Sequence, residues 1–362
     1  MLRVEMLPAG HGDSIWIEYG ESSSPRRVLI DGGTGPTYDT LRARIASLAE
    51  GDRRFDLAVV THIDADHIEG FIRLLQDRRL GMEFADVWFN GWRHLPGAAF
   101  GPEQGEILSA LLTDREIPWN QASGGGPICV SDDGALPTYE LEGGLTLTVL
   151  GPTGHELEDL MPVWEREVRK EGLVPGSTRE ALDLLLKTKR LLVPTEFEPG
   201  APALDVEALA TPDDDSDSSE PNASSITLLA EFEGRSVLLA ADCVAGVLAA
   251  DVRRLLEGRR LDVLEVDAFK LPHHGSRRNV RDDFLPLVAS RRYLVSTNGA
   301  YFDHPDPEAI ARVLVRSEKD RTLLFNYRTQ ENEIWDDPLL MERWGYSVAY
   351  PQPGTLGMAT EL

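Results

Sequence analysis

The segment from Thr61 to His67 reads Thr-His-Ile-Asp-Ala-Asp-His, so four side chains able to bind a metal directly follow an apolar run. Imidazole nitrogens and carboxylate oxygens are ligands that divalent metals prefer, and a loop at the end of a strand can aim all four into one space. The alternative is a polar turn in which Asp66 caps the helix expected from Ile68. Because a cap needs only one such residue, the segment predicts a metal site.

Two later segments repeat this arrangement. Asp242 follows the apolar stretch 238–241, and the pair His273-His274 follows another short strand that ends near Leu271. Alone, an Asp after a strand is usually a turn residue, and a single His is usually an ordinary core or surface group. Taken with the first segment, they predict three strand ends that converge on one site.

The apolar spacing predicts the elements that position these residues. Strands are expected near 15–19, 27–30, 55–60, 86–89 and 145–150, with helices over 40–48 and 68–75. Further strands are expected at 226–232 and 236–240, joined by a turn at Glu233-Gly234, and then at 268–271, 293–296, 323–327 and 346–351. Asp306-Pro307 is a typical helix start. The pattern predicts an α/β fold of two packed sheets with helices outside.

The middle of the chain differs from both flanks. From 155 to 189 the pattern is helical, and 211–221 carries a run of acids that predicts a solvated, mobile loop. A calcium site is the alternative, but the run has neither EF-hand spacing nor a central glycine. We therefore expect a first half over 1–154, a helical insertion or cap with an acidic loop over 155–221, and a second half over 222–362.

Composition limits the classes of protein. The chain has 362 residues, a net charge of −25 and 42% hydrophobic residues, which excludes collagen-like and wholly disordered chains. It has no apolar run long enough for a membrane span and no secretory signal, and its two cysteines fit a reducing environment, so a cytoplasmic location without membrane contact is expected. Because sequence-blind binding of nucleic acid depends on Lys and Arg, only short or local phosphodiester contacts are expected.

The sequence resembles the metallo-β-lactamase fold and, within it, the ComEC-type competence-protein branch. The resemblance rests on segments that occur in the family's order, namely His11-Gly12-Asp13-Ser14, Leu29 to Gly33, His62 to His67, Asn222 to Ser225, Leu239 to Asp242, Pro272 to Ser276, and His304-Pro305. It implies an αββα four-layer sandwich with a helical insertion, a centre of two divalent metal ions at the sheet edges, and hydrolytic chemistry.

The resemblance also implies a ligand set. The first metal would take His62 and Asp64, and the second would take Asp66 and His67. Asp242 would bridge the two ions. His274 fits better than His273 as a ligand of the second metal, which leaves His273 behind the ligands or facing the substrate.

Two departures from the family's pattern affect the metal. Asp64 stands where the family usually has a second histidine, and Asn222 stands where many members have another. The first metal would therefore have more oxygen ligands, which shifts its preference from Zn²⁺ toward Mn²⁺ or Fe²⁺. We expect zinc or manganese, and iron less.

The expected reaction is hydrolysis by a hydroxide that bridges the metals, with Asp66 orienting it. His273 and His304 are the candidate general acids, and Asp13 and Asp31 are expected beneath the site. Further residues expected behind the ligands or near the substrate are Asn222, Lys270, Arg277 and Arg278, of which the last three would attract a phosphate unless they form ordinary solvated surface. Trp88, Trp92 and His94 would line the pocket or, as is commoner for Trp, the core.

The expected function is a metal-dependent phosphodiesterase or nuclease-like hydrolase that acts on a small-molecule or nucleic-acid phosphodiester. Three alternatives stay open: a lactone or ester hydrolase, a di-iron oxidoreductase of the same fold, and a catalytically silent protein that acts through a partner. The di-iron class usually keeps the histidine that Asn222 replaces.

Overall fold

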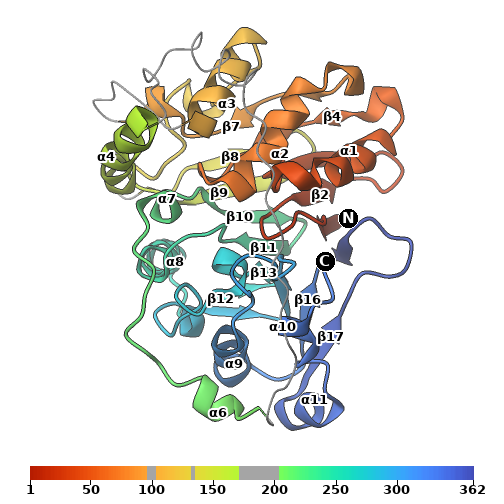
Figure 1. Ribbon diagram of the computed structural model, residues 1–362, viewed down its shortest axis with the longest axis vertical. Coiled ribbons are helices and arrows are strands. Elements are labelled where there is room, and N and C mark those ends of the chain that lie inside the picture. The colour runs from red at the N-terminus through yellow and green to blue at the C-terminus, as the bar shows by residue number, and fades with distance from the viewer. Residues whose placement is uncertain (96–102, 132–134, 171–203) are drawn as a thin grey trace.

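A computed structural model describes residues 1–95, 103–131, 135–170 and 204–362. Two β-sheets pack face to face, and helices cover the outer face of each, as Figure 1 shows. This arrangement is the predicted αββα sandwich, a four-layer form of the α/β class. Among the described residues, no helix combines the length and the apolar character needed to cross a membrane.

The first sheet has six strands and comes mainly from the first quarter of the chain. Its order is β18 (Met358–Glu361), β1 (Leu2–Met6), β2 (Ile15–Tyr19), β3 (Arg26–Ile30), β5 (Leu57–Val59) and β7 (Val87–Trp88). The covering helices are α1 (Tyr38–Ala46), α2 (Ala65–Gln76), α3 (Glu103–Asp114) and α4 (Gly154–Lys170). Strands β3, β5 and β7 are parallel, so their carboxyl ends lie at one edge.

The second sheet has eight strands. Its order is β17 (Tyr346–Ala349), β16 (Arg321–Phe325), β15 (Arg292–Val295), β13 (Ala268–Lys270), β11 (Arg235–Leu239), β10 (Thr227–Phe232), β9 (Thr146–Gly151) and β8 (Thr138–Glu140). Two further sheets have two strands each. One pairs β4 (Arg54–Phe55) with β6 (Glu83–Phe84), and the other pairs β12 (Leu264–Val266) with β14 (Val288–Ser290). From β11 to β17 the neighbours are parallel, which again gathers their carboxyl ends.

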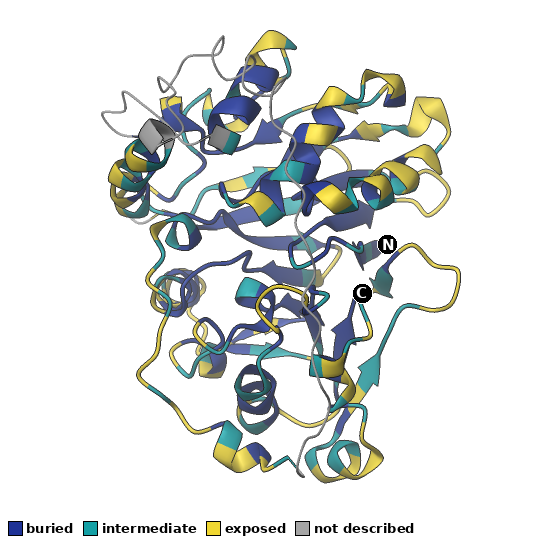
Figure 2. Cartoon of the chain, viewed as in Figure 1, coloured by how far each residue is buried: buried dark blue, intermediate teal, exposed yellow. Residues whose placement is uncertain are grey.

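Helices α8 (Ala245–Arg259) and α9 (Pro307–Arg316) cover most of the second sheet. The shorter helices are α6 (Val206–Leu209), α7 (Glu220–Ala223), α10 (Gln330–Glu333) and α11 (Pro338–Trp344). One apolar cluster fills the space between the two sheets. A second lies between the first sheet and its helices, and a third lies between the second sheet and its helices. Figure 2 shows the result, with buried strands in the middle and exposed residues on the outer helix faces.

The predicted strands and helices are present, with their ends shifted by a few residues. The turn at Glu233-Gly234 joins β10 to β11 as expected, and both residues have positive φ, +48° and +77°. The run 55–60 is divided, because Asp56 leaves the strand to bind Arg26 (Oδ1–Nη2 2.5 Å). The elements that were not predicted include α3, α8, and the paired strands β1 and β18, which meet only through a contact between the two ends of the chain.

The segment 155–221 is described only in part. Its helix α4 buries Trp164 in the core of the first half, and Val206 of α6 is buried in the cluster beneath α9. The part of the predicted helical pattern beyond 170 lies outside the described residues until 204. The division of the chain at 154 and 221 therefore stays a prediction.

Most residues of the acidic run are exposed, as expected for a solvated loop, but three of its acids are paired or buried. Asp213 binds Arg312 (Oδ2–Nη2 2.9 Å), Asp215 binds Arg278 (Oδ1–Nε 3.0 Å), and the side chain of Asp217 is only 6% exposed. Sequence reasoning missed the partners of Asp213 and Asp215 because they lie 99 and 63 positions later in the chain. The run fastens the middle segment to the second half of the fold.

A buried carboxyl group outside the site couples stability to pH. Asp251 lies on α8, with Oδ2 3.4 Å from the hydroxyl of Thr227 and Oδ1 3.2 Å from Arg254. Gly151 leaves room for it, since a Cβ there would lie 2.3 Å from Oδ2. Burial raises the pKa of Asp251 to about 8, and the nearby arginine only partly opposes this.

We expect Asp251 to make the protein less stable as pH rises. The pKa of Asp251 is 3.8 in the unfolded chain and about 8 in the folded chain, so between these pH values the folded state binds a proton that the unfolded state does not. The free energy of unfolding therefore falls as pH rises from about 4 to about 8. Relative to Asp251→Asn, wild-type protein should lose roughly 1 kcal/mol of unfolding free energy per pH unit between pH 5 and 7. Urea unfolding of both proteins measures this, and parallel pH profiles would contradict it.

Candidate metal centre

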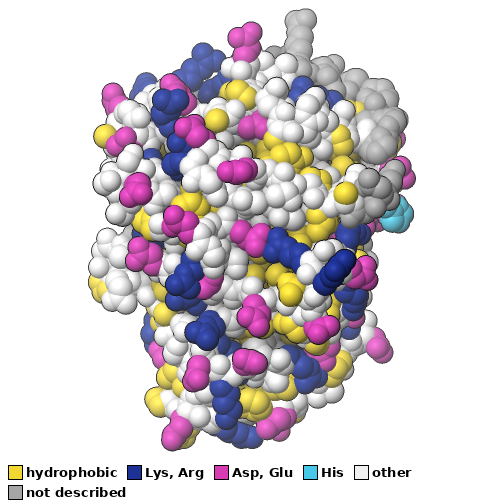
Figure 3. All heavy atoms as spheres, turned by 180° about the vertical axis from the view of Figure 1, so that it is seen from behind, with side chains coloured by type: hydrophobic (Ala, Val, Ile, Leu, Met, Phe, Trp, Pro, Cys, Tyr) yellow, Lys and Arg dark blue, Asp and Glu magenta, His cyan; other side chains and the backbone are white. Residues whose placement is uncertain are grey.

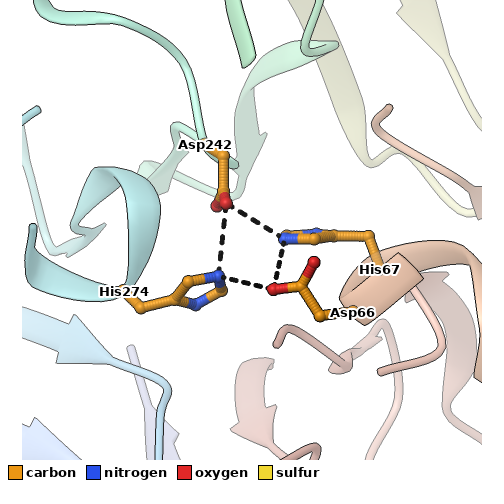
Figure 4. Close-up of side chains that lie close together, drawn as sticks. All are labelled: Asp66, His67, Asp242 and His274. Carbon is orange, nitrogen blue, oxygen red and sulfur yellow. Dashed lines mark ion pairs between the residues drawn. The ribbon is translucent and has the colours of Figure 1, made fainter. Parts of the chain in front are cut away.

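Four side chains from both halves of the chain meet at one edge of the sandwich. Asp66 and His67 lie in the first turn of α2, Asp242 follows β11, and His274 lies in the turn Pro272–Gly275 after β13. One ligand atom from each lies within 4.8 Å of the others. Figure 4 shows the four side chains pointing toward a common centre.

Asp242 is the central member of this cluster. Its Oδ2 lies 3.3 Å from Nε2 of His67 and 3.2 Å from Nε2 of His274, while Oδ2 of Asp66 lies 3.4 Å from Nε2 of His274 (Figure 4). Asp242 therefore contacts both imidazoles that were assigned to the second metal. Its role as a bridge between two metals stays a prediction.

The outer nitrogens of the two imidazoles are held from behind. Nδ1 of His67 lies 2.8 Å from Oδ2 of Asp31, a carboxylate that also accepts hydrogen bonds from the amide and the hydroxyl of Thr61. Nδ1 of His274 donates to the carbonyl of Ser296 at 2.9 Å. A proton fixed on Nδ1 leaves the lone pair of Nε2 facing the cluster, which is the form that binds metal.

Several nitrogen and oxygen atoms in and beside the cluster lack a hydrogen-bond partner, which a bound cation could replace. Nε2 of His62, His67 and His274 and Oδ1 of Asp242 are buried and have no hydrogen-bond partner. Buried polar atoms in folded proteins are nearly always paired, so a group of orphans at one place needs an explanation. A divalent cation fits both the nitrogen and oxygen donors and the excess of buried carboxylates.

The charges in the cluster shift the pKa values of its members. Burial lowers the pKa of His67 and of His274, but the charge of Asp242 and other nearby carboxylates raises each well above 6.5. Burial raises the pKa of Asp242, and the two imidazoles hold it well below its usual value. Without a cation, protons on the imidazoles would balance the carboxylates.

Backbone strain gathers around the same residues. Of the ten non-glycine residues with positive φ in the described part of the chain, four belong to or adjoin the site: Asp31, Ala241, His273 and His274. Each such conformation costs roughly 1 kcal/mol or more and persists only where its surroundings enforce it. Here the strained turns direct Asp242 and both histidines into the site.

Helix α2 is brought to the site by three close backbone contacts. A Cβ at Gly12 would lie 1.8 Å from the carbonyl oxygen of Asp66, and one at Gly70 would lie 1.9 Å from that of Gly32. The amide of Gly32 donates to the carbonyl of His67 at 2.8 Å. Only glycine allows this approach, which sets the position of the helix turn that carries Asp66 and His67.

Asp66 does not cap this helix. The N-cap position belongs to Asp64, whose side chain makes no capping bond, while Asp66 lies in the first turn. The reading of the segment as a capping turn centred on Asp66 is therefore wrong. With its side chain only 16% exposed, Asp66 faces His274 instead.

His62 and Asp64, assigned to a first metal, lie beside the cluster without joining the group of four. Their side chains approach each other at 3.7 Å (Nε2–Oδ2), and the imidazole of His62 lies 4.2 Å from that of His67 between ring centres. Asp64 is 41% exposed. Their role as ligands stays a prediction.

His273 lies beside the cluster. Its Nε2 lies 3.8 Å from Oδ2 of Asp242, and its Nδ1 lies 3.0 Å from Oδ1 of Asn279 and 3.5 Å from Oδ2 of Asp217. The amide of Asn222 donates to Asp217 at 2.7 Å and lies 3.4 Å from the same Nδ1. His273 is thus oriented by a small polar network.

The general-acid candidate His304 lies next to His273, with 5.6 Å between ring centres, and its Nδ1 is 3.4 Å from Asp306. Sequence reasoning missed three members of this region: Asp217, Asn279 and His11. Asp217 was masked by the acidic run around it. His11 lies near the site because its neighbour Gly12 packs against the backbone carbonyl of Asp66.

The cations near the histidine pair are already engaged. Lys270 is fully buried and binds Asp13 (Nζ–Oδ2 2.7 Å), which lies 3.4 Å from Nδ1 of His274. Arg277 binds Asp213 and Asp215, and Arg278 binds Asp215. Lys270 therefore lies behind the cluster, which is one of the two positions expected for it, and the two arginines are paired with acids. Their expected role near a phosphate stays a prediction.

The aromatic residues expected either at the pocket or in the core lie in the core. Trp88 is fully buried between the sheets, and Trp92 packs against Trp164. His94 is buried, with its Nδ1 accepting from the amide of Gly91. The core alternative is therefore the one that all three fit.

A four-layer αββα sandwich with an acid and imidazole cluster at one edge of its sheets is the metallo-β-lactamase fold. Residues 7–80, which include Asp66 and His67 of the cluster, match the family model "Metallo-beta-lactamase superfamily". None of the curated proteins compared with the chain matches it.

Two solved structures show distant likenesses. The short form of human tRNase Z aligns at 10% identity and a TM-score of 0.42, with 100% of this chain and 99% of that chain covered. A mutant of CmlA beta-hydroxylase aligns at 16% identity and a TM-score of 0.40, and the chain spans only 54% of its length. Both likenesses are too distant to bear on activity.

Because α2 packs closely against the backbone of Gly32, we expect Gly70→Ala to destabilise the protein and disturb the site. The new methyl group would force the helix away from the Gly32 carbonyl, at a cost of about 1–3 kcal/mol in unfolding free energy, and would weaken metal binding. The control is Gly258→Ala on α8, where a Cβ meets nothing within 4 Å and should gain up to about 1 kcal/mol. Urea unfolding and competition with a chromophoric chelator measure both, and equal behaviour of the two variants would contradict the packing argument.

Metal affinity should rise with pH. The raised pKa values of His67 and His274 mean that protons occupy the ligand atoms below neutrality and must leave when a metal binds. The association constant for Zn²⁺ or Mn²⁺ should increase by roughly tenfold or more per pH unit from pH 5.5 to 7. Calorimetry checks this, with His155→Ala, an exposed histidine on α4, as control; an affinity independent of pH would contradict it.

Proposed function

We propose that the chain is a metal-dependent hydrolase that cleaves phosphodiesters. The observation that carries this proposal is the cluster of Asp66, His67, Asp242 and His274, in which buried donor atoms without partners converge from both sheets. A catalytically silent fold would have no reason to keep such atoms buried and unpaired, because each costs free energy.

A divalent ion held there would lower the pKa of a bound water and neutralise charge that develops on the substrate. Asp31 and the Ser296 carbonyl hold the two ligand imidazoles in the required tautomer. In this proposal Asp66, His67 and His274 hold one ion, His62 and Asp64 hold the other, and Asp242 bridges the two. The cofactor of the proposal is therefore a pair of divalent ions, zinc or manganese.

His273 is the proposed group that moves a proton to the leaving group. Burial lowers the pKa of His273, but the charge of Asp242 and the hydrogen bond to Asp217 raise it above its usual value, which favours the protonated form that a general acid needs. Its Nδ1 is directed at Asn279 and Asp217, which leaves Nε2 free on the side of the cluster. His304 is the second candidate because it lies beside His273.

The choice of a phosphodiester rests on the sequence resemblance to the ComEC-type branch, carried by His62 to His67 and Pro272 to Ser276. The net charge of −25 favours a short substrate over a long nucleic acid. On the face drawn in Figure 3, acidic and basic side chains are interspersed and form no broad basic surface. A cytoplasmic location belongs to the same proposal.

The test is a metal analysis followed by hydrolysis assays with bis-p-nitrophenyl phosphate, single-stranded DNA, RNA and a lactone. We expect metal-dependent cleavage of at least one phosphodiester, and Asp66→Asn should lower kcat/KM at least about 100-fold because it removes a ligand charge. Thermal unfolding should show that this variant folds, since Asp66 is not part of the core.

The matched control is Asp251→Asn, which changes a buried aspartate outside the site and should retain activity near that of wild type. Cleavage of the lactone alone would replace the phosphodiester by an ester substrate. Bound iron with visible absorbance and no hydrolysis would favour a di-iron oxidoreductase. Stoichiometric zinc or manganese with no hydrolysis of any substrate would contradict the proposed enzyme.

A further inference from the structure

Two large aromatic side chains are exposed beside the metal centre. Tyr301 is 58% exposed and Phe302 is 52% exposed, and their rings lie 4.4 Å apart between centres at an interplanar angle of 89°. They lie in the loop between β15 and α9, two residues before His304. Leaving two neighbouring rings in water costs free energy, so their exposure calls for a ligand.

Each exposed ring is backed by a histidine. Tyr301 stacks on His11 (5.0 Å between ring centres, 22° between planes), and Phe302 stacks on His304 (5.7 Å, 27°). These contacts cover one face of each ring and leave the rest of the ring accessible. A ring held in this way loses little conformational entropy when a planar ligand stacks on it.

The two histidines connect the aromatic pair to the metal centre. His304 lies 5.6 Å from His273, whose Nε2 faces Asp242, and Phe302 itself lies 6.4 Å from His273 between ring centres. On the other side, the amide of Asn298 donates to the carbonyl of Gly10 at 2.9 Å and ties the aromatic loop to the loop that carries His11. The pair therefore stands at the rim of the cluster.

Charge decides what kind of contact a phosphodiester substrate can make here. Lys270 is buried against Asp13, and Arg277 and Arg278 bind Asp213 and Asp215, so these cations are not available to follow a phosphate chain. Binding of a nucleotide through stacking on aromatic rings needs no such cations, because every base has a flat π-face. The aromatic pair supplies what the paired cations do not.

We propose that Tyr301 and Phe302 form a stacking platform for the nucleobase next to the scissile phosphate, so that the substrate is a nucleoside phosphodiester. This inference rests on the proposed phosphodiesterase function and names its substrate class. The phosphate meets the cluster around Asp242, and the base lies on the exposed ring faces. Selectivity comes from the presence of a base and depends little on its identity.

The experiment compares two esters that have the same leaving group, thymidine 5′-(p-nitrophenyl phosphate) and methyl p-nitrophenyl phosphate, with the metal-loaded protein. We expect kcat/KM to favour the thymidine ester about tenfold or more, since one stacked base contributes about that factor. Tyr301→Ala and Phe302→Ala should each lower this preference severalfold through KM, and Tyr301→Phe should keep it. Leu339→Ala, an exposed apolar residue on α11 that is 76% exposed, is the matched control.

The outcomes separate this inference from the function on which it rests. Cleavage of both esters with equal kcat/KM, or an equal loss on both in Tyr301→Ala and Phe302→Ala, would overturn the platform and leave the phosphodiesterase standing. If neither ester is cleaved, the phosphodiesterase fails. Binding of thymidine 5′-monophosphate to the metal-loaded protein by calorimetry then decides the platform, which requires Tyr301→Ala to weaken binding about tenfold.

Discussion

The main constraint on this structure is a buried cluster in which several carboxylates lie beside imidazoles whose inner nitrogens have no hydrogen-bond partner. Asp31, Asp66 and Asp242 lie within or directly behind one cluster, and only Asp13 has a lysine partner there. Such a concentration of carboxylates is costly unless protons on His67 and His274 or a cation balance it. The parallel strands of both sheets gather their carboxyl ends at this edge, which is how the second half of the fold supplies Asp242 and His274 to ligands from the first half.

Close backbone packing turns this convergence into a defined geometry. The loop 31–34 and the loop carrying Gly12 approach α2 at distances that exclude any side chain. The helix can therefore sit in only one position, and hydrogen bonds from Gly32 and Gly70 fix it there. On the opposite side, left-handed residues at Ala241 and His273-His274 turn the chain sharply after β11 and β13. Rigid strands on one side and a tightly seated helix on the other keep the four ligands aligned.

Some of the acidic residues have a structural role that the composition of the chain does not reveal. Asp213 and Asp215 neutralise the arginines that follow the histidine pair, and Asp217 reaches the polar network around His273. The middle segment thereby contributes to the site, and it also removes free positive charge from its surroundings. Recognition through aromatic rings instead of cations is consistent with this distribution.

The sequence by itself determined the fold class and the placement of potential metal-binding residues directly after three strands, because both follow from short-range patterns. The order of strands near 15–30, 226–240 and 268–296, the turn at Glu233-Gly234, and the polar residues after three strands are all readable from neighbouring positions. The fold class is confirmed, and Asp66, His67, Asp242 and His274 lie together as that reading expected.

Only the tertiary structure decided which side chains meet across long distances. Nothing near Asp217 in the chain indicates that it faces His273, and nothing near Arg277 indicates that Asp213 and Asp215 pair with it. The pairing of β1 with β18 and the stacking of His11 on Tyr301 join residues nearly the whole chain apart. Local spacing determines the direction of a side chain relative to its own strand or helix, whereas its partner depends on how distant elements pack, which no local pattern encodes.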